Sequence, residues 1–153
     1  MEHSYIGDLG ITLTSPNGTQ VTLLAYPTGG NTWLGQATDD DSSQELVGIG
    51  SYYGWSMNPE YNGTMSDAIS AGNFVTLDNL NPDGFIETGE SLISSTYLPV
   101  GNFNDFIGTP LNGNWTITVT DNLTIDNGWI FSWGITINQN IIPSSWSFDN
   151  YIV

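Results

Sequence analysis

The sequence predicts an all-β fold, an antiparallel β-sandwich with long loops, and three observations support this. The chain of 153 residues contains no Lys and no Arg, so strong helix formers are scarce. Short apolar segments alternate with polar residues at the two-residue period of a strand with one buried face. Gly, Asn, Thr, Ser and Asp separate these segments, as expected for turns. With 39% hydrophobic and 12% aromatic residues, the composition is that of a packed domain.

The first expected element is a β-hairpin close to the N-terminus. Leu9, Ile11 and Leu13 alternate with small or polar residues, and the apolar pattern resumes over 21–24. Between them, residues 15–18 read Ser-Pro-Asn-Gly. Proline presets one turn dihedral angle and Asn-Gly accepts positive φ, so this segment predicts the turn of the hairpin.

Two further strands are expected in the last third of the chain. Residues 115–119 alternate Trp, Ile and Val with threonine, and residues 131–137 alternate Phe, Trp and Ile with small polar residues. The aromatic residues of these segments are therefore expected in the core, together with Phe106. Asp121 and Asp126 are expected to organise the turn between the two strands.

The middle and the end of the chain have weaker patterns. Between about residues 35 and 98 no period is clean, which predicts long connections between strands. Residues 1–138 are expected to form one domain. Residues 139–153 are expected to be a linker or the start of a following module.

The charge distribution excludes several classes of partner. The formal net charge is −16, from sixteen acidic residues and no Lys or Arg. Tight binding to nucleic-acid phosphates or to an anionic bilayer then has no electrostatic basis. There is no Cys and no apolar run of about 18 residues. The carboxylates need water, hydrogen-bond donors or metal cations as partners.

The first candidate metal site is an acidic stretch. Asp39, Asp40, Asp41 and Glu45 place four carboxylates within seven residues. Calcium takes six to eight oxygen ligands and would relieve the repulsion between these groups. The alternative is a solvated acidic loop. Asp8 is a further candidate ligand, or else a turn residue that accepts backbone hydrogen bonds.

A second stretch matches much of a calcium-loop consensus. Asn79, Asn81, Asp83 and Glu90 stand at positions one, three, five and twelve of an EF-hand-type loop, with a glycine at position six. The flanking residues do not predict helices, so a true EF-hand is not expected. The alternatives are a non-helical calcium loop and an Asn-Pro-Asp-Gly turn.

Aromatic residues in the Gly-rich connections form a candidate ligand-binding group. Trp33, Tyr52, Tyr53 and Trp55 have the chemistry of a sugar-stacking platform. Local packing of the same rings is the alternative.

Catalysis is not expected. His3 is the only histidine, and no Gly-x-Ser-x-Gly segment exists. Residue types alone leave a paired-carboxylate glycosidase open, which needs two carboxylates about 5 to 9.5 Å apart in a cleft.

Four ordered motifs resemble a known family. They are Gly-Asp-Leu at 7–9, Ser-Pro-Asn-Gly-Thr at 15–19, Gly113 with Trp115 and Val119, and Gly128 with Trp133. Together they resemble the P/Homo B domain, the non-catalytic β-sandwich that follows the subtilisin-like domain of proprotein convertases. The resemblance implies a jelly-roll-like, galactose-binding-like sandwich, and calcium in the connection that holds residues 39–45.

The middle and the tail resemble the version of this domain in large Bacteroidetes surface proteins, many of which have gliding-motility or type IX secretion features. Compared with the family, the opening strands before residue 2 and the protease domain are missing. An edge of the sandwich is then expected to be unpaired or completed by another chain.

The function expected from these observations is that of a non-catalytic, calcium-stabilised structural or adhesion module in a secreted or cell-surface bacterial protein. Its expected partners are the neighbouring domains of a larger chain, a glycan or another protein chain. The alternatives are a carbohydrate-binding module and an accessory stabilising domain of a subtilisin-like protease.

Overall fold

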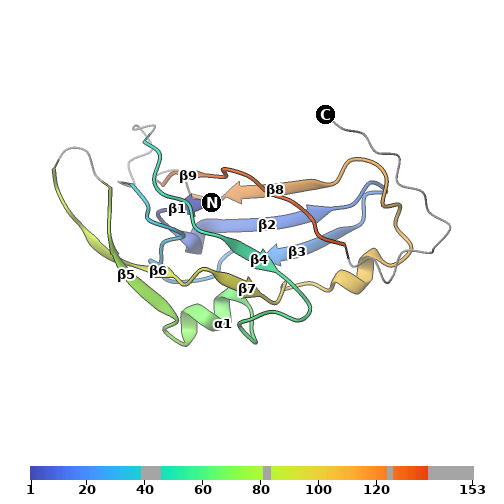
Figure 1. Ribbon diagram of the computed structural model, residues 1–153, viewed down its shortest axis with the longest axis horizontal. Helices are drawn as coiled ribbons and strands as arrows, with labels where there is room; N and C mark the ends of the chain where they lie inside the picture. The colour runs from blue at the N-terminus through green and yellow to red at the C-terminus, as the bar shows by residue number, and fades with distance from the viewer. Residues whose placement is uncertain (39–45, 81–83, 124–125, 138–153) are drawn as a thin grey trace.

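The computed structural model describes residues 1–38, 46–80, 84–123 and 126–137, and it shows an all-β protein (Figure 1). This confirms the predicted fold class. The strands are β1 (Glu2–His3), β2 (Leu9–Thr14), β3 (Gln20–Leu24), β4 (Tyr53–Trp55), β5 (Phe74–Asp78), β6 (Thr88–Leu92), β7 (Ser95–Tyr97), β8 (Thr116–Asp121) and β9 (Gly128–Trp129). The helical turns are η1 (Ile6–Asp8), α1 (Met65–Ser70) and η2 (Phe103–Phe106). None of the helices in these ranges has the length and apolar character needed to cross a membrane.

The longest strands form a three-stranded antiparallel sheet in the order β3-β2-β8. The hairpin prediction is confirmed, because β2 and β3 pair from Thr14↔Gln20 to Ile11↔Leu24. Gly18 has a φ of +87° in the turn, a conformation that glycine adopts without steric cost. The predicted strand over 115–119 is also confirmed as β8, in which Val119 pairs with Ile11.

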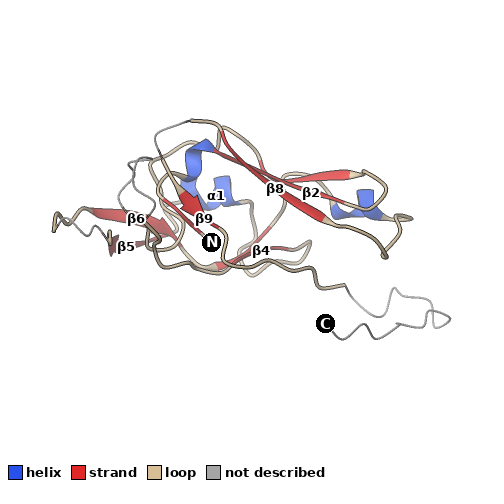
Figure 2. Cartoon of the chain, turned by 90° about the horizontal axis from the view of Figure 1, so that it is seen from above, coloured by secondary structure: helices blue, strands red, loops and turns tan. Residues whose placement is uncertain are grey.

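A second layer consists of shorter ladders, and in the view from above it lies opposite β2 and β8 (Figure 2). Within it, β1 pairs with β9, and β5 pairs with β6, both antiparallel. Bridges from His3 to Leu34 and from Trp33 to Ser91 connect these ladders through residues 33–34. One pair, β4 with β7, is parallel, which differs from the purely antiparallel sandwich that the sequence predicts.

The hydrophobic core lies between the layers. Its largest fully buried apolar side chains come from both layers and from α1. They are Ile6, Leu9, Ile11, Val21, Leu24, Leu34, Met65, Leu92 and Tyr97. Phe106 and Trp115 pack against this core with their ring centroids 5.0 Å apart in an edge-to-face arrangement. The prediction that Phe106 and Trp115 belong to the core is therefore confirmed, and both rings lie at the margin of the core.

The middle of the chain contains more structure than its pattern predicts. Four strands and α1 lie between residues 53 and 97. The strands have three to five residues, too few for a period to emerge. The six-residue helix α1 begins with a capping box between Thr64 and Asp67, which is a local signal that the apolar pattern does not reveal.

The prediction of a strand over residues 131–137 is wrong. Only Gly128 and Trp129 pair with β1, and the following residues have no strand assignment. Phe131 and Trp133 are 52% and 46% exposed, so they are not core residues. The physical reason is that β1 supplies only two residues to the ladder, and an apolar alternation forms a strand only where a partner strand is present.

Candidate functional site

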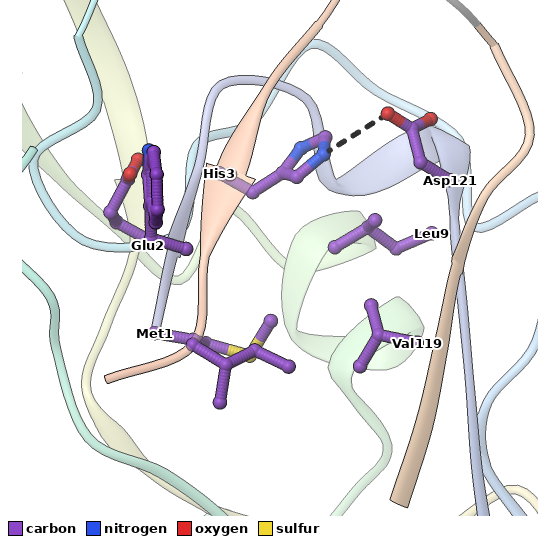
Figure 3. A pocket seen from close by; sticks show the side chains of 9 residues that line it. Met1, Glu2, His3, Leu9, Val119 and Asp121 are labelled. Carbon is purple, nitrogen blue, oxygen red and sulfur yellow. Dashed lines mark ion pairs between the residues drawn. The ribbon is translucent and has the colours of Figure 1, made fainter. Parts of the chain in front are cut away.

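A pocket of about 350 Å³ lies beside β1, where this strand meets the ends of β8 and β9 (Figure 3). The polar groups along its wall are Glu2, His3 and Asp121. Leu9 and Val119 of the three-stranded sheet supply apolar wall on the side of the His3 ring. The pocket therefore combines acidic groups, the single imidazole of the chain and an apolar floor.

Local hydrogen bonding sets the orientation of His3. Its Nδ1 accepts from the backbone N–H of Tyr5 at 3.0 Å, so the proton of the neutral ring resides on Nε2. Nε2 faces Asp121 Oδ2 at 3.6 Å. Burial is the largest influence and lowers the pKa of His3, although Asp121 and Asp8 oppose it electrostatically. The imidazole is therefore neutral at pH 7.

Glu2 is a buried carboxyl group that the sequence pattern does not signal. Its side chain is 1% exposed, and Oε1 accepts from the Gly48 N–H at 3.4 Å. Oε2 has no hydrogen-bond partner among residues 1–38, 46–80, 84–123 and 126–137. Burial raises the pKa of Glu2 to about 6. Burial of the charged Glu2 carboxylate in the second layer therefore lowers the stability of the folded state.

The arrangement around His3 does not form a nucleophilic triad within the described ranges. One ring nitrogen faces the Tyr5 N–H and the other faces Asp121. No serine or threonine hydroxyl in that part of the chain hydrogen-bonds to either nitrogen. The geometry is that of a packed polar contact.

Most candidate ligands of the first acidic stretch lie outside the described residues, namely Asp39, Asp40, Asp41 and Glu45. The structure does show the two ends of this stretch. Thr38 Oγ1 donates a hydrogen bond to the carbonyl of Leu46 at 3.1 Å, which holds the ends together.

The remaining candidate of this group, Asp8, is buried at the end of η1. Its carbonyl oxygen accepts from Asn122, from the backbone N–H at 3.1 Å and from Nδ2 at 2.8 Å. Asp8 therefore links η1 to the end of β8 through its backbone. A metal-ligand role for its carboxylate stays a prediction.

The second predicted calcium loop lies across the β5–β6 hairpin. Asn79 is buried, and its Oδ1 accepts from the Glu87 N–H at 3.0 Å while its own N–H donates to the Glu87 carbonyl at 2.8 Å. Glu90 lies within β6 opposite Thr76. Asn81 and Asp83 lie outside the described residues. The Asn79 side chain thus closes the hairpin, and calcium in the loop stays a prediction.

Within the described ranges, no three His, Cys, Asp or Glu residues come close enough together to hold a metal ion. Asp8 and Glu90 belong to these ranges, whereas the acidic stretch 39–45 and residues 81–83 lie outside them. Calcium at those two segments stays a prediction.

The four aromatic candidates do not form one platform. Trp33 and Tyr53 are 8% and 9% exposed and belong to the buried set. Tyr52 is 66% exposed, and Trp55 is half-buried with its indole N–H unpartnered among the described residues. Sugar stacking stays a prediction. Among these four residues, only Tyr52 and Trp55 expose a substantial part of their side chains.

Tyr53 of β4 joins two other segments of the second layer through its hydroxyl group, which accepts from the Gly35 N–H at 2.8 Å and donates to the Leu92 carbonyl of β6 at 2.9 Å. We expect Tyr53→Phe to lower the free energy of unfolding by about 2 kcal/mol, because a buried donor and a buried acceptor both lose their partner. The exposed control Tyr52→Phe should change it by less than about 0.5 kcal/mol. Urea denaturation of both variants measures the difference, and equal midpoints would contradict the role of this hydroxyl.

A second pocket, of about 280 Å³, lies at the end of the β5–β6 ladder where Asn79 and Glu87 close the hairpin. Hydroxyl, amide and carboxyl groups dominate its wall, and the Trp33 ring contributes one apolar side. Its lining residues are Ser4, Tyr5, Asn31, Trp33, Thr38, Asn79, Glu87, Thr88 and Gly89. Two candidates from separate sequence patterns, Trp33 and Asn79, thus meet at one cavity.

The fold is that of an all-β domain with two small pockets. Residues 1–50, about a third of the chain, match the family model of the proprotein convertase P-domain. This confirms the resemblance of the sequence to the P/Homo B domain, and the match lies in residues 1–50. P-domains are non-catalytic accessory domains of proprotein convertases and subtilisin-like proteins, and they occur in secreted proteins. No curated protein and no solved structure matches the chain.

Proposed function

We propose that this chain is a non-catalytic, calcium-stabilised module of a larger secreted or cell-surface bacterial protein, with a structural or adhesive role. The observation that carries this proposal is the position of the acidic stretch 39–45 inside the segment that matches the P-domain. A domain of a larger chain that supports its neighbours is also the role that the P-domain family suggests.

The donor chemistry of this stretch fits calcium. Asp39, Asp40, Asp41 and Glu45 offer hard oxygen donors in a chain that has no Lys or Arg to neutralise them. The Thr38–Leu46 hydrogen bond holds the two ends of the stretch close together. Calcium would supply positive charge to these carboxylates and thereby stabilise the folded state by linkage.

The first test is thermal unfolding with millimolar calcium and with a chelator. If calcium is present at about a hundred times its dissociation constant, we expect about 2.7 kcal/mol of stabilisation. This corresponds to a midpoint about 5–10 °C higher for a domain of this size. Magnesium at the same concentration should produce a smaller shift, because it tolerates fewer protein ligands. Equal midpoints in calcium and chelator would overturn the metal proposal.

Variants assign the effect to one stretch. Replacement of Asp39, Asp40 and Asp41 by asparagine should abolish the calcium-dependent shift. A control that removes one exposed carboxylate elsewhere, Asp105→Asn in η2, should retain it. If Asp83→Asn abolishes the shift instead, the calcium binds in the β5–β6 loop.

A second candidate function, glycan binding, is favoured by the cavity of about 280 Å³. Its wall places the Trp33 ring beside Asn31 and Glu87. Exposed amide and carboxyl groups are a suitable lining for a sugar, because sugars present a rim of hydroxyl groups. The Trp33 ring, which is 8% exposed, adds only a small apolar surface.

A glycan array with calcium present tests this candidate. Selective binding should be lost in Asn31→Ala and Glu87→Gln, whose side chains are exposed and line the cavity. It should persist in Asn58→Ala, an exposed residue that does not line it. A blank array, or binding that both sets of variants retain, would argue against a sugar at this cavity.

A further inference from the structure

The chain contains asparagine followed directly by glycine in several places, and the fold holds these pairs differently. In such a pair the glycine backbone nitrogen can attack the side-chain amide carbon of the asparagine, because glycine has no Cβ that would shield it. The attack requires that the glycine N–H and the asparagine side chain are not held by other groups. The pairs are Asn17-Gly18, Asn62-Gly63, Asn112-Gly113 and Asn127-Gly128.

Hydrogen bonds hold the first two pairs. The Gly18 N–H donates to the Ser15 carbonyl at 2.9 Å, and Asn17 Oδ1 accepts from Ser15 Oγ at 2.6 Å. Gly63 is buried, and its N–H donates to the Tyr61 carbonyl at 2.8 Å. In both pairs the glycine nitrogen would have to give up a hydrogen bond before it could attack.

The ladder of β1 and β9 holds the pair Asn127-Gly128. The Asn127 carbonyl accepts from the Ser4 N–H at 3.3 Å, and Gly128 lies opposite His3. Asn127 Oδ1 is buried. Attack on this amide would place negative charge on a buried oxygen, which is costly.

The pair Asn112-Gly113, just before β8, is not held in these ways. Both residues are exposed. Within the described ranges, no hydrogen bond engages the Asn112 side chain or the Gly113 N–H. Gly113 has a φ of +126°, and a Cβ on it would lie 2.7 Å from the Cβ of Pro16. The packing therefore requires glycine at position 113, which preserves the reactive pair.

We propose that Asn112 is a spontaneous deamidation site, at which the folded chain exchanges a side-chain amide for a carboxylate. The Gly113 nitrogen loses its proton to hydroxide and forms a bond to Asn112 Cγ. The bond from Cγ to the amide nitrogen breaks, and ammonia leaves with a proton taken from water. Water then opens the resulting succinimide ring at either of its carbonyl groups. The products are aspartate and isoaspartate, and the net reaction consumes water and releases ammonia.

The isoaspartate product would alter the start of β8. The Leu111 carbonyl accepts from the Trp115 indole N–H at 3.2 Å, so this hydrogen bond spans Asn112. The Trp115 ring packs edge-to-face against Phe106 at the margin of the core. Isoaspartate lengthens the main chain between Leu111 and Trp115 by one methylene group. We therefore expect isoaspartate to weaken these contacts and aspartate to leave them intact.

The first test is incubation of the whole chain at mildly alkaline pH, followed by peptide mapping and mass spectrometry. Chymotrypsin is the suitable protease, because the chain has no Lys or Arg for trypsin. Asn112 should deamidate at least about tenfold faster than Asn17 and Asn62, whose glycine N–H groups are hydrogen-bonded. The rate should rise with pH, because the attacking nitrogen must lose its proton. Equal rates at these sites, or a faster rate at Asn17 or Asn62, would overturn the proposal.

The same incubation in guanidinium chloride is the matched control. Unfolding removes the hydrogen bonds that protect Asn17 and Asn62, so the rates at these sites should approach the rate at Asn112. This result would show that the fold selects the site. If Asn112 keeps its full advantage in the unfolded chain, the neighbouring sequence selects it and the structural argument is wrong.

Two variants separate the added charge from the lengthened backbone. Asn112→Gln should abolish the main modified species, because glutamine would have to close a larger ring, whereas Asn17→Gln should leave it. Asn112→Asp supplies the carboxylate without the extra methylene group. In urea denaturation, the purified isoaspartate form should have a folded-to-unfolded ratio about fivefold or more below that of fresh protein. Asn112→Asp should match fresh protein. A modified species that persists in Asn112→Gln would place the site elsewhere, and an isoaspartate form of unchanged stability would contradict the effect on β8.

Discussion

Gly35→Ala is expected to lower the free energy of unfolding by about 3 kcal/mol. Gly35 has a φ of +63°, which costs an L-residue about 1 kcal/mol or slightly more. A Cβ at this position would also lie 2.5 Å from the Ile49 carbonyl oxygen and 3.1 Å from the Cβ of Glu2. Neither atom is the end of a flexible side chain, so the backbone must move. Overpacking of this kind typically costs a further free energy of about 1–3 kcal/mol.

Gly18→Ala is the matched control for this prediction. Gly18 also has a positive φ, of +87°, but a Cβ on it would meet no atom within 4 Å. Only the conformational cost of about 1 kcal/mol then applies. Urea denaturation of both variants separates the two contributions. Equal losses would show that residues 35 and 49 can separate freely.

Glu2→Gln is expected to stabilise the protein at neutral pH by about 1–2 kcal/mol, since a shift of one pKa unit corresponds to about 1.4 kcal/mol. Burial raises the pKa of Glu2 from 4.5 to about 6 in the folded state. The folded state therefore holds this proton more tightly than the unfolded state does. The penalty is absent below pH 4.5, develops between pH 4.5 and 6, and is fully present above that range.

The measurement is the free energy of unfolding of both proteins at several pH values in chelator. The stabilising effect of Glu2→Gln should shrink as the pH falls from 7 toward 4.5. His3 acts in the opposite direction, because its lowered pKa makes acid destabilising. His3 is present in both proteins, so its contribution cancels in the difference. A difference that does not depend on pH would contradict the burial of the Glu2 carboxyl group.

The sequence predicts the parts of the fold that carry a local code. The β2–β3 hairpin has alternating apolar residues and a turn sequence between them, and β8 has a continuous alternation of its own. Both signals lie within a few consecutive residues. The short strands β4 and β7 have no such signal, because three residues contain barely one full alternation.

The same limit explains the incorrect assignment of residues 131–137 and the missed Glu2. The alternation of Phe131 and Trp133 resembles that of Trp115 and Ile117, yet only the second pair belongs to a ladder. Pairing depends on a partner strand that no local pattern encodes. Likewise, Glu2 is buried by residues 35 and 48, which are distant in sequence. Burial of a single charged residue becomes visible only in three dimensions.

The strand order of the three-stranded sheet has a consequence for biosynthesis. β2 lies in the middle, and its partner β8 follows about a hundred residues later in the chain. While the chain emerges from the ribosome, β3 can pair with one side of β2 soon after β2 itself. The other side of β2 has no partner strand until β8 has been translated, near the end of the domain. Pairing between such distant segments is intrinsically slow. The nascent chain therefore passes through a stage in which the strand at the centre of the finished sheet is an open edge.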